Sequence, residues 1–272
     1  MLRRMIIPAL LCLAGLCAFG KSPAGIAFCD VDRLYDTLPA LFYDDSDYTP
    51  EGRLKWNSAR YERKVRQTAA LIDSMGLDIV ALWGVENEQV VRDIAQACRG
   101  DYAYIHRTLN SLDGMDFALL YYGDRFYPGR VETGRRYLRI EGELDGEELS
   151  LILCADPRMA EWVVRDVRAE TPERKVLLMG RTALAHPERL GLLDATARAA
   201  LAGRGNRRST RGSRWEMYHR ILADTALRFG ACDVYARRFL LDERLGTPVP
   251  TYSGRLYRGG LGRSLPVYIY IR

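Results

Sequence analysis

The stretch LDIVALW, residues 77–83, is the clearest structural signal in the chain, because a short and nearly continuous apolar run is typical of a buried strand. Gly76 stands directly before it and ends an amphipathic segment. One face of that segment recurs at three- and four-residue spacing through Tyr61, Val65, Thr68, Ala69 and Ile72. The pattern therefore predicts a helix that ends at Gly76 and leads into a buried strand.

Similar short apolar runs predict strands on both sides of this pair. They are GIAFCDV (25–31), YAYIH (102–106), DFALLYY (116–122), RRYLRI (135–140), ELSLILC (148–154), KVLLMG (175–180), WEMYHRILA (215–223) and LPVYIYI (265–271). Further helices are expected near 88–98, 158–169 and 190–202. Strands mixed with helices, with several direct strand-to-strand steps, indicate an α/β or α+β sandwich. Because the sequence has neither an internal repeat nor a linker, residues 21–272 are interpreted as a single domain.

Residues 1–20, MLRRMIIPALLCLAGLCAFG, have the layout of a secretory signal peptide. Two arginines precede an apolar run that starts at Met5, and Ala18-Phe19-Gly20 is a small-x-small cleavage site. The alternative is a membrane anchor, for which the apolar run is short. We therefore expect export to the periplasm or the extracellular space, with no membrane-spanning segment left after cleavage.

Composition excludes a globally disordered chain. Of the 272 residues 48% are hydrophobic and 28% are charged, which is ordinary for a globular protein. The formal charge of +5 falls to +3 (5 − 2) when two arginines leave with residues 1–20, and this charge is too small to indicate a nucleic-acid partner. The remaining cysteines fit no zinc-site spacing, and both free thiols and one disulfide stay open. They are Cys29, Cys98, Cys154 and Cys232.

Several long motifs follow one another in an order that is specific to one family. They are DVDRLYDT (30–37), DYTPEGRLKWNSARYERKV (47–65), LDIVALWGVEN (77–87), GMDFALLY (114–121), KVLLMG (175–180), WEMYHRI (215–221) and TYSGRLYRGGLGRSLPV (251–267). Together they resemble the endonuclease/exonuclease/phosphatase family, which shares the deoxyribonuclease I fold. The resemblance implies a four-layer sandwich, in which two mainly antiparallel sheets pack face to face with helices on both outer faces. It also implies hydrolysis of phosphodiesters or phosphomonoesters with a divalent metal, usually Mg²⁺.

The resemblance maps the family's metal site onto positions that are partly changed in this chain. Asp30 stands where the family has a polar asparagine. Gly84 stands where the family has the glutamate that is its principal metal ligand, and a glycine has no side chain to coordinate a metal. Glu86 lies two residues further on, so it would point to the same face of a strand and could substitute, although the family also has a glutamate there beside the ligand. Asp116, in GMDFALLY, is a retained carboxylate.

The later motifs of the family have lost their catalytic side chains as well. After KVLLMG the resemblance implies an Asp and an Asn that orient the nucleophile, where this chain has Arg181 and Ala183. Arg181 reverses the charge beside the expected metal, which opposes cation binding. His219 replaces an Asp, and Arg263-Ser264 replaces the Asp-His pair that acts as general base. At neutral pH neither an arginine nor a serine can act as that base.

These losses predict a catalytically inactive member of the family that serves as a binding or interaction module. The signal-peptide layout of residues 1–20 predicts that it is exported. Its partner would be a protein or a phosphate-bearing ligand, no residue has an assigned catalytic role, and no cofactor is expected. The alternative is a divergent phosphoesterase or nuclease that hydrolyses phosphodiester or phosphomonoester bonds. In that alternative Asp30, Glu86 and Asp116 would hold Mg²⁺, and His219 would assist the reaction.

An arginine-rich stretch supplies the remaining candidate site. Arg207, Arg208, Arg211 and Arg214 either bind an anion or lie in a solvated loop, and the second interpretation is favoured. The stretch has no aromatic residue before Trp215, which argues against a binder of single-stranded nucleic acid. Nucleic acid is therefore a disfavoured partner.

Overall fold

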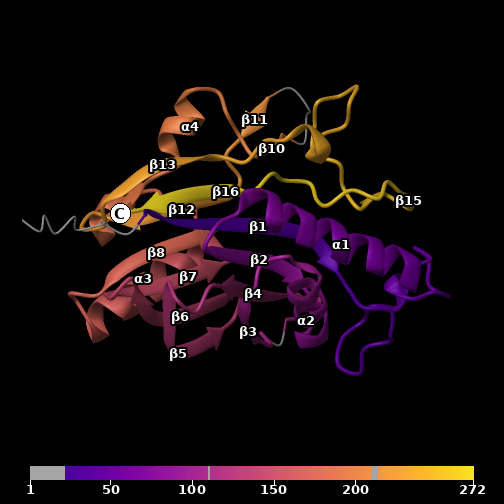
Figure 1. Cartoon of the computed structure of the whole chain (residues 1–272), viewed down its shortest axis with the longest axis horizontal. Helices are drawn as coiled ribbons and strands as arrows, with labels where there is room; N and C mark the ends of the chain where they lie inside the picture. Colours follow the sequence, from indigo (N-terminus) through magenta and orange to yellow (C-terminus); the bar gives the residue numbers. More distant parts are fainter. Residues whose placement is uncertain (1–21, 110, 210–213) are drawn as a thin grey trace, which may run out of the picture.

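Two six-stranded β-sheets pack face to face in the computed structural model, and helices lie on their outer sides (Figure 1). The structure describes residues 22–109, 111–209 and 214–272. The helices are α1 (Ser58–Met75), α2 (Glu88–Ala97), α3 (Pro157–Glu170) and α4 (Ala197–Leu201), with short 3-10 turns at Ser46–Tyr48, Pro187–Leu190 and Arg238–Leu240. The predicted four-layer sandwich is confirmed by this arrangement.

The first sheet has the strand order β13-β16-β1-β2-β4-β3. Its strands are β13 (Phe229–Val234), β16 (Val267–Ile271), β1 (Ala24–Leu34), β2 (Ile79–Val85), β4 (Asp116–Tyr121) and β3 (Ala103–Arg107). β1 and β2 are parallel, and the other neighbours in this sheet are antiparallel.

The second sheet has the order β5-β6-β7-β8-β12-β9, in which β7 and β8 are parallel and the other neighbours antiparallel. Its strands are β5 (Phe126–Gly134), β6 (Tyr137–Leu144), β7 (Glu147–Cys154), β8 (Lys175–Gly180), β12 (Arg220–Asp224) and β9 (Leu192–Asp194). Two short hairpins complete the strands, β10 (Arg207–Arg208) with β11 (Trp215–Glu216) and β14 (Tyr252–Ser253) with β15 (Leu256–Tyr257).

Three apolar layers hold the sandwich together. The central layer lies between the sheets, where side chains such as Phe28 and Phe117 of the first sheet pack with Leu151 of the second. An outer layer joins α1 and α2 to the first sheet, and another joins α3 to the second. Burial of these side chains removes apolar surface from water, which is the main force that stabilises the layers.

The helix ends follow from capping residues. The Asn57 side chain accepts a hydrogen bond from the Arg60 amide at 3.1 Å and caps α1, and Gly76 ends this helix in a left-handed conformation with φ 59°. Asn87 caps α2 by accepting from the Val90 amide at 3.0 Å. These caps fix the ends of α1 and the start of α2, so β2 between them is held in place.

Parts of the strand and helix prediction are wrong. The stretch 215–223 is not one strand, because β11 pairs with β10 and β12 pairs with β8 in a different sheet. The predicted helix near 190–202 contains the edge strand β9 and only a short helix, α4. β5 and β13 were not predicted, since both are edge strands with half-exposed side chains and therefore lack an apolar run.

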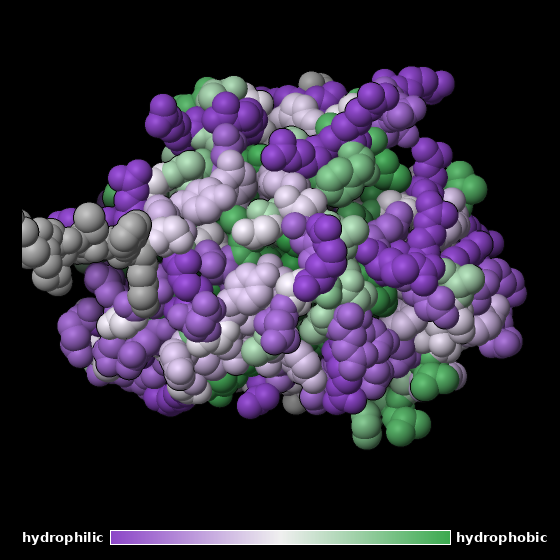
Figure 2. Space-filling model, in the orientation of Figure 1, coloured by the Kyte–Doolittle hydropathy of each residue, from purple (hydrophilic) through white to green (hydrophobic). Residues whose placement is uncertain are grey.

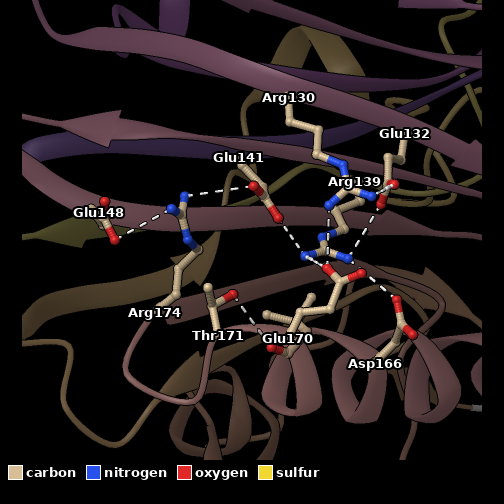
Figure 3. Close-up of polar contacts among 10 residues, drawn as sticks. Arg130, Glu132, Arg139, Glu141, Glu148, Asp166, Glu170, Thr171 and Arg174 are labelled. Carbon is tan, nitrogen blue, oxygen red and sulfur yellow. Dashed lines mark hydrogen bonds and ion pairs between the residues drawn. The ribbon is translucent and has the colours of Figure 1, made fainter.

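A buried arginine holds α3 against the second sheet (Figure 3). Arg139 on β6 is only 1% exposed, and four carboxylates surround its guanidinium group. Glu132 and Glu141 come from the sheet, whereas Asp166 and Glu170 come from α3, with an Arg139–Glu170 separation of 2.7 Å. Because a buried guanidinium must be paired, this contact couples the helix to the sheet.

Most of the face shown in Figure 2 is hydrophilic, with hydrophobic residues at its lower edge. The loop between β1 and α1 reaches this edge in Figure 1 and carries Leu41 and Phe42, which are 90% and 94% exposed. Cys29 packs in the layer beneath α1 and Cys154 in the layer beneath α3, so these two thiols do not meet. Among the described helices, none is long and apolar enough to cross a membrane.

Candidate functional site

Several loops meet at one end of the sandwich and enclose a pocket of about 430 Å³. The parallel pairs β1–β2 and β7–β8 both end at this pocket, where Asp30 lies on β1 and Arg181 directly follows β8. His219 directly precedes β12, the antiparallel neighbour of β8. The structure thus brings together four residues singled out from the family motifs, Asp30, Arg181, His219 and Arg263, and adds Arg207 from the arginine-rich stretch.

A left-handed turn interrupts β1 beside the pocket. Asp32 and Arg33 have φ angles of 51° and 61°, a region that residues other than glycine seldom adopt. Asp30 stabilises the turn by accepting a hydrogen bond from the Asp32 amide at 2.9 Å. Lys64 on α1 donates to the Asp32 carbonyl at 2.9 Å, and burial lowers the pKa of this lysine to about 8. The turn places Arg33 in the lining of the pocket.

His219 and Asp30 form the one histidine–carboxylate contact of this pocket within the described residues. The His219 Nε2 atom lies 3.6 Å from Asp30 Oδ2, and the imidazole also packs on Phe28 with ring centroids 5.2 Å apart. Burial, followed by the positive charges of Arg207 and Arg181, lowers the pKa of His219 to about 3. Burial raises the pKa of Asp30. A neutral imidazole with so low a pKa is a weak base at neutral pH.

Five arginines line the pocket, and they set its electrostatic character. They are Arg33, Arg136, Arg181, Arg207 and Arg263. Aromatic rings hold three of them. The guanidinium carbons of Arg181 and Arg207 lie 5.0 and 4.2 Å from the centroid of the Tyr218 ring, and that of Arg136 lies 5.8 Å from the Trp83 ring. Stacking uses the flat faces of the guanidinium groups and leaves their N–H edges available.

Arg263 replaces the aspartate of the family's general-base pair and takes part in a different set of contacts. Its Nη2 atom donates to the Tyr252 carbonyl at 2.8 Å, and its Nε atom lies 3.7 Å from Asp32 Oδ1. The neighbouring Ser264 is buried, and its backbone forms a β-bridge with Arg207. The stretch 263–264 therefore joins the end of the chain to the arginine-rich stretch.

Glu86 and Asp116 line a second pocket, of about 290 Å³, instead of the first. Glu86 accepts hydrogen bonds from the Asp36 amide at 2.6 Å and from the Tyr43 hydroxyl at 2.8 Å, and burial raises its pKa to about 7. Asp116 contacts His106 Nε2 at 3.1 Å and accepts from a backbone amide. The pairing of β2 with β4 is irregular between Trp83 and Val85, so the simple two-residue alternation does not extend to Glu86.

The backbone at Gly84 is suited to glycine. Its φ is +90°, and a Cβ atom added there would lie 3.2 Å from the Arg33 amide nitrogen and 3.7 Å from Asp30 Oδ1. A side chain at this position would therefore point toward Asp30. The carboxylate that the family uses as its principal metal ligand is therefore missing from this position, and Glu86 faces the other pocket.

The residues present do not fit the magnesium site that the family implies. Magnesium requires near-octahedral coordination by oxygen atoms. Across the described ranges, no group of three or more His, Cys, Asp or Glu side chains is placed to hold a metal ion. The carboxylates of the predicted site are divided between two pockets, and the first pocket carries five guanidinium groups whose charge opposes a cation.

The other predicted residues that the structure describes lie outside the first pocket. Ala183 is exposed, and Arg214 is exposed as well. The guanidinium carbon of Arg208 lies 5.5 Å from the centroid of the Trp215 ring, and Arg208 does not line the first pocket. Arg211 lies outside the described residues. Of the four arginines proposed for anion binding, the structure brings Arg207 to the pocket.

Sequence reasoning missed two arginines of the pocket, Arg33 and Arg136. Both have left-handed backbone conformations, with φ angles of 61° and 68°. Arg136 was included in a predicted strand at 135–140, whereas it lies in the turn between β5 and β6. Arginine is not a residue type that favours a left-handed conformation, so neither position was predicted to lie in such a turn. The contact between His106 and Asp116 was missed as well.

Comparisons with known proteins agree with this fold. Residues 25–157 match the model of the Endonuclease/Exonuclease/phosphatase family. A humanized D. rerio TDP2 with 14 mutations is similar in structure, with a TM-score of 0.59 and 13% identity over 93% of this chain and 100% of that chain. A mannosyl-6-phosphatase from Bacteroides thetaiotaomicron has a TM-score of 0.60 and 14% identity over 92% and 99%. No curated protein matches the sequence.

A further solved structure, an endonuclease/exonuclease/phosphatase from Bacteroides vulgatus, has a TM-score of 0.58 and 14% identity over 93% of this chain and 99% of that chain. The fold and the matched motifs together define the class. Residues 25–157 match the endonuclease/exonuclease/phosphatase family, and the chain has the deoxyribonuclease I-like fold of that family. Members of this family are typically metal-dependent phosphoesterases and nucleases.

Proposed function

We propose that this protein is an exported, catalytically inactive member of the family that acts as a binding module. The single observation that supports the proposal is the composition of the pocket at the end of the sandwich. Arg181 and Arg263 stand there in place of family carboxylates, and Glu86 and Asp116 face a different pocket. Export is proposed from the signal-peptide layout of residues 1–20.

Phosphoester hydrolysis has two requirements, of which the pocket meets only one. The reaction needs a cation, or an equivalent positive charge, at the phosphoryl oxygens, and it needs a base that takes a proton from water. The pocket has positive charge from its arginines. Its only imidazole is His219, whose low pKa makes it a poor base. The pocket can therefore hold an anion much better than it can activate water.

A hydrolysis assay on the mature protein, residues 21–272, tests the proposal. The substrates are p-nitrophenyl phosphate, bis-p-nitrophenyl phosphate, a phosphorylated mannose and DNA, each with Mg²⁺ or Mn²⁺. A phosphorylated sugar is included because one structural relative is a mannosyl-6-phosphatase. We expect rates no higher than those of the Asp30→Ala and Asp116→Ala variants. Metal-dependent turnover that disappears in either variant would overturn the proposal.

The alternative, a divergent phosphoesterase, is favoured by one observation, the 3.6 Å contact between His219 and Asp30 inside the pocket. An enzyme that uses this pair would lose turnover in His219→Gln. Calorimetric titration with Mg²⁺ separates the two functions independently of any substrate. Binding of Mg²⁺ that is lost in Asp30→Ala supports the alternative, and the absence of binding supports the binding module.

A further inference from the structure

Three arginines of the pocket have no acceptor for their side-chain N–H groups within the described residues. They are Arg136, Arg181 and Arg207, whose side chains take part in stacking on aromatic rings but in no hydrogen bond or ion pair. The buried Arg139, by contrast, is paired with four carboxylates. Guanidinium groups gathered in a hollow without acceptors are suited to an anionic ligand.

Backbone pairing fixes the positions of Arg181 and Arg207, and one aromatic ring contacts both side chains. The Arg181 amide donates to the Cys154 carbonyl at 2.8 Å, and Arg207 pairs through its backbone with Ser264 and with Glu216 of β11. The ring of Tyr218 contacts both side chains. Because the side chains are held before a ligand arrives, binding loses little conformational entropy.

The charge of the pocket matches a dianion. Its lining has five arginines and three aspartates, Asp30, Asp32 and Asp113, so the formal charge is +2 (5 − 3). His219 adds no charge because its pKa lies far below neutral pH. Asp32 is engaged by the Thr251 amide at 3.0 Å and by the nearby Arg263, which leaves the three unpaired arginines to face a ligand.

A second hollow, of about 720 Å³, continues from the pocket and shares Asp113 and Arg136 with it. Its lining includes the hydroxyl groups of Thr108, Ser111 and Thr133. Hydroxyl groups can donate and accept hydrogen bonds, so this hollow is suited to a neutral body that carries hydroxyl groups of its own.

We infer that the pocket binds a phosphomonoester dianion directly through Arg136, Arg181 and Arg207, without a metal ion, while a hydroxyl-bearing body such as a sugar occupies the neighbouring hollow. The guanidinium groups supply the positive charge for which the family uses a metal. This inference deepens the proposed function by naming the ligand class of the same site. No covalent step is involved, and the ester leaves unchanged.

Calorimetric titration in the presence of EDTA tests the inference. The probes are inorganic phosphate, mannose 6-phosphate, unphosphorylated mannose and inorganic sulfate. We expect binding of both phosphate probes with EDTA present, tighter binding of the sugar phosphate than of phosphate, and no binding of mannose. Binding should weaken as salt concentration rises, since the contacts are ionic.

Variants assign the binding to named side chains. Arg181→Gln and Arg207→Gln should each weaken the binding of mannose 6-phosphate by about tenfold or more, because each removes a charged hydrogen-bond donor. Arg208→Gln is the matched control, since it changes the same charge in the same stretch but outside the pocket. Melting temperatures measured without ligand show whether each variant is folded.

Three results would overturn the inference. These are binding that requires Mg²⁺, binding that Arg208→Gln weakens as much as Arg207→Gln does, and the absence of phosphate binding in the folded wild-type protein. None of them measures turnover, so the hydrolysis assay still decides the proposed inactivity. Conversely, turnover in the hydrolysis assay would defeat the proposed inactivity while phosphate binding in EDTA was still observed. The failures of the two proposals are therefore distinguishable.

Discussion

The Nε2 atom of His219 lies 3.6 Å from the Oδ2 atom of Asp30, yet the two groups do not form an ion pair at neutral pH. Burial lowers the pKa of the histidine and raises that of the aspartate, so both charged forms are disfavoured. The adjacent arginines lower the pKa of the histidine further. His219 is thus a packed, neutral group although it lies beside a carboxylate. Its low pKa should affect how the free energy of unfolding depends on pH.

The first prediction concerns the acid sensitivity of the fold. The pKa of His219 falls from an ordinary 6.5 to about 3 in the folded protein. Below pH 6.5 the unfolded state takes up a proton that the folded state does not, so stability should fall as pH falls from about 6.5 toward 3. The His219→Gln variant should show a shallower decline in the free energy of unfolding, measured by urea denaturation. His186→Gln, at an exposed histidine, should leave the decline unchanged.

The second prediction concerns Glu86, whose pKa rises from 4.5 to about 7 through burial. Between these pH values the folded state keeps a proton that the unfolded state has released, so this residue makes stability fall as pH rises. The stability of Glu86→Gln relative to wild type should therefore increase from pH 4.5 to pH 7. The exposed Glu88→Gln is the control. A constant difference between wild type and Glu86→Gln over this range would contradict the assignment.

The third prediction concerns the arginine under α3. Arg139→Ala leaves Glu132, Glu141 and the two carboxylates of α3 without their shared partner, and should destabilise the protein by about 3–5 kcal/mol in urea unfolding. Arg165→Ala, which breaks one exposed pair with Glu161, should cost less than about 1 kcal/mol. Equal effects of the two substitutions would show that the buried network does not hold the helix.

The fourth prediction concerns restoration of the family's metal ligand. Gly84→Glu should not create Mg²⁺ binding detectable by calorimetry, because five arginines line the pocket it would face. It should also destabilise the fold by about 1–3 kcal/mol, since φ at this position is +90°. Gly84→Ala separates the two effects, because it introduces the backbone strain without the charge. Tight Mg²⁺ binding by Gly84→Glu alone would contradict our description of the pocket.

The sequence indicated the sandwich and much of its element order, for a physical reason. Strands such as 77–83 are buried on both faces and helices such as α1 have capped ends, so local chemistry agrees with the final structure. The edge strands β5 and β13 and the short strand β9 escaped prediction, because hydrogen bonding to a neighbouring strand, and not an apolar run, defines them.

The candidate site was predictable only in part. The alignment with the family motifs singled out Asp30, Arg181, His219 and Arg263, and these four residues line one pocket. The arginine-rich stretch looked uniform, although Arg207 enters the pocket while the next residue, Arg208, stacks on Trp215. Successive side chains of a strand point to opposite faces, which separates Arg207 from Arg208. A strand of two residues is too short for this alternation to be recognised in the sequence. Arg136 was not predicted as a pocket residue, because it lies in a left-handed turn and not in the strand expected at 135–140.

The contact of Arg181 and Arg207 with the same Tyr218 ring has a thermodynamic consequence. Like charges held together in a hollow repel one another, and the unfolded chain relieves that repulsion by separating them. A bound oxyanion relieves it without unfolding, so the melting temperature becomes a readout of ligand concentration. At equal ionic strength, multivalent oxyanions should therefore protect the fold better than chloride does, and a thermal-shift screen can find the natural ligand before its chemistry is known.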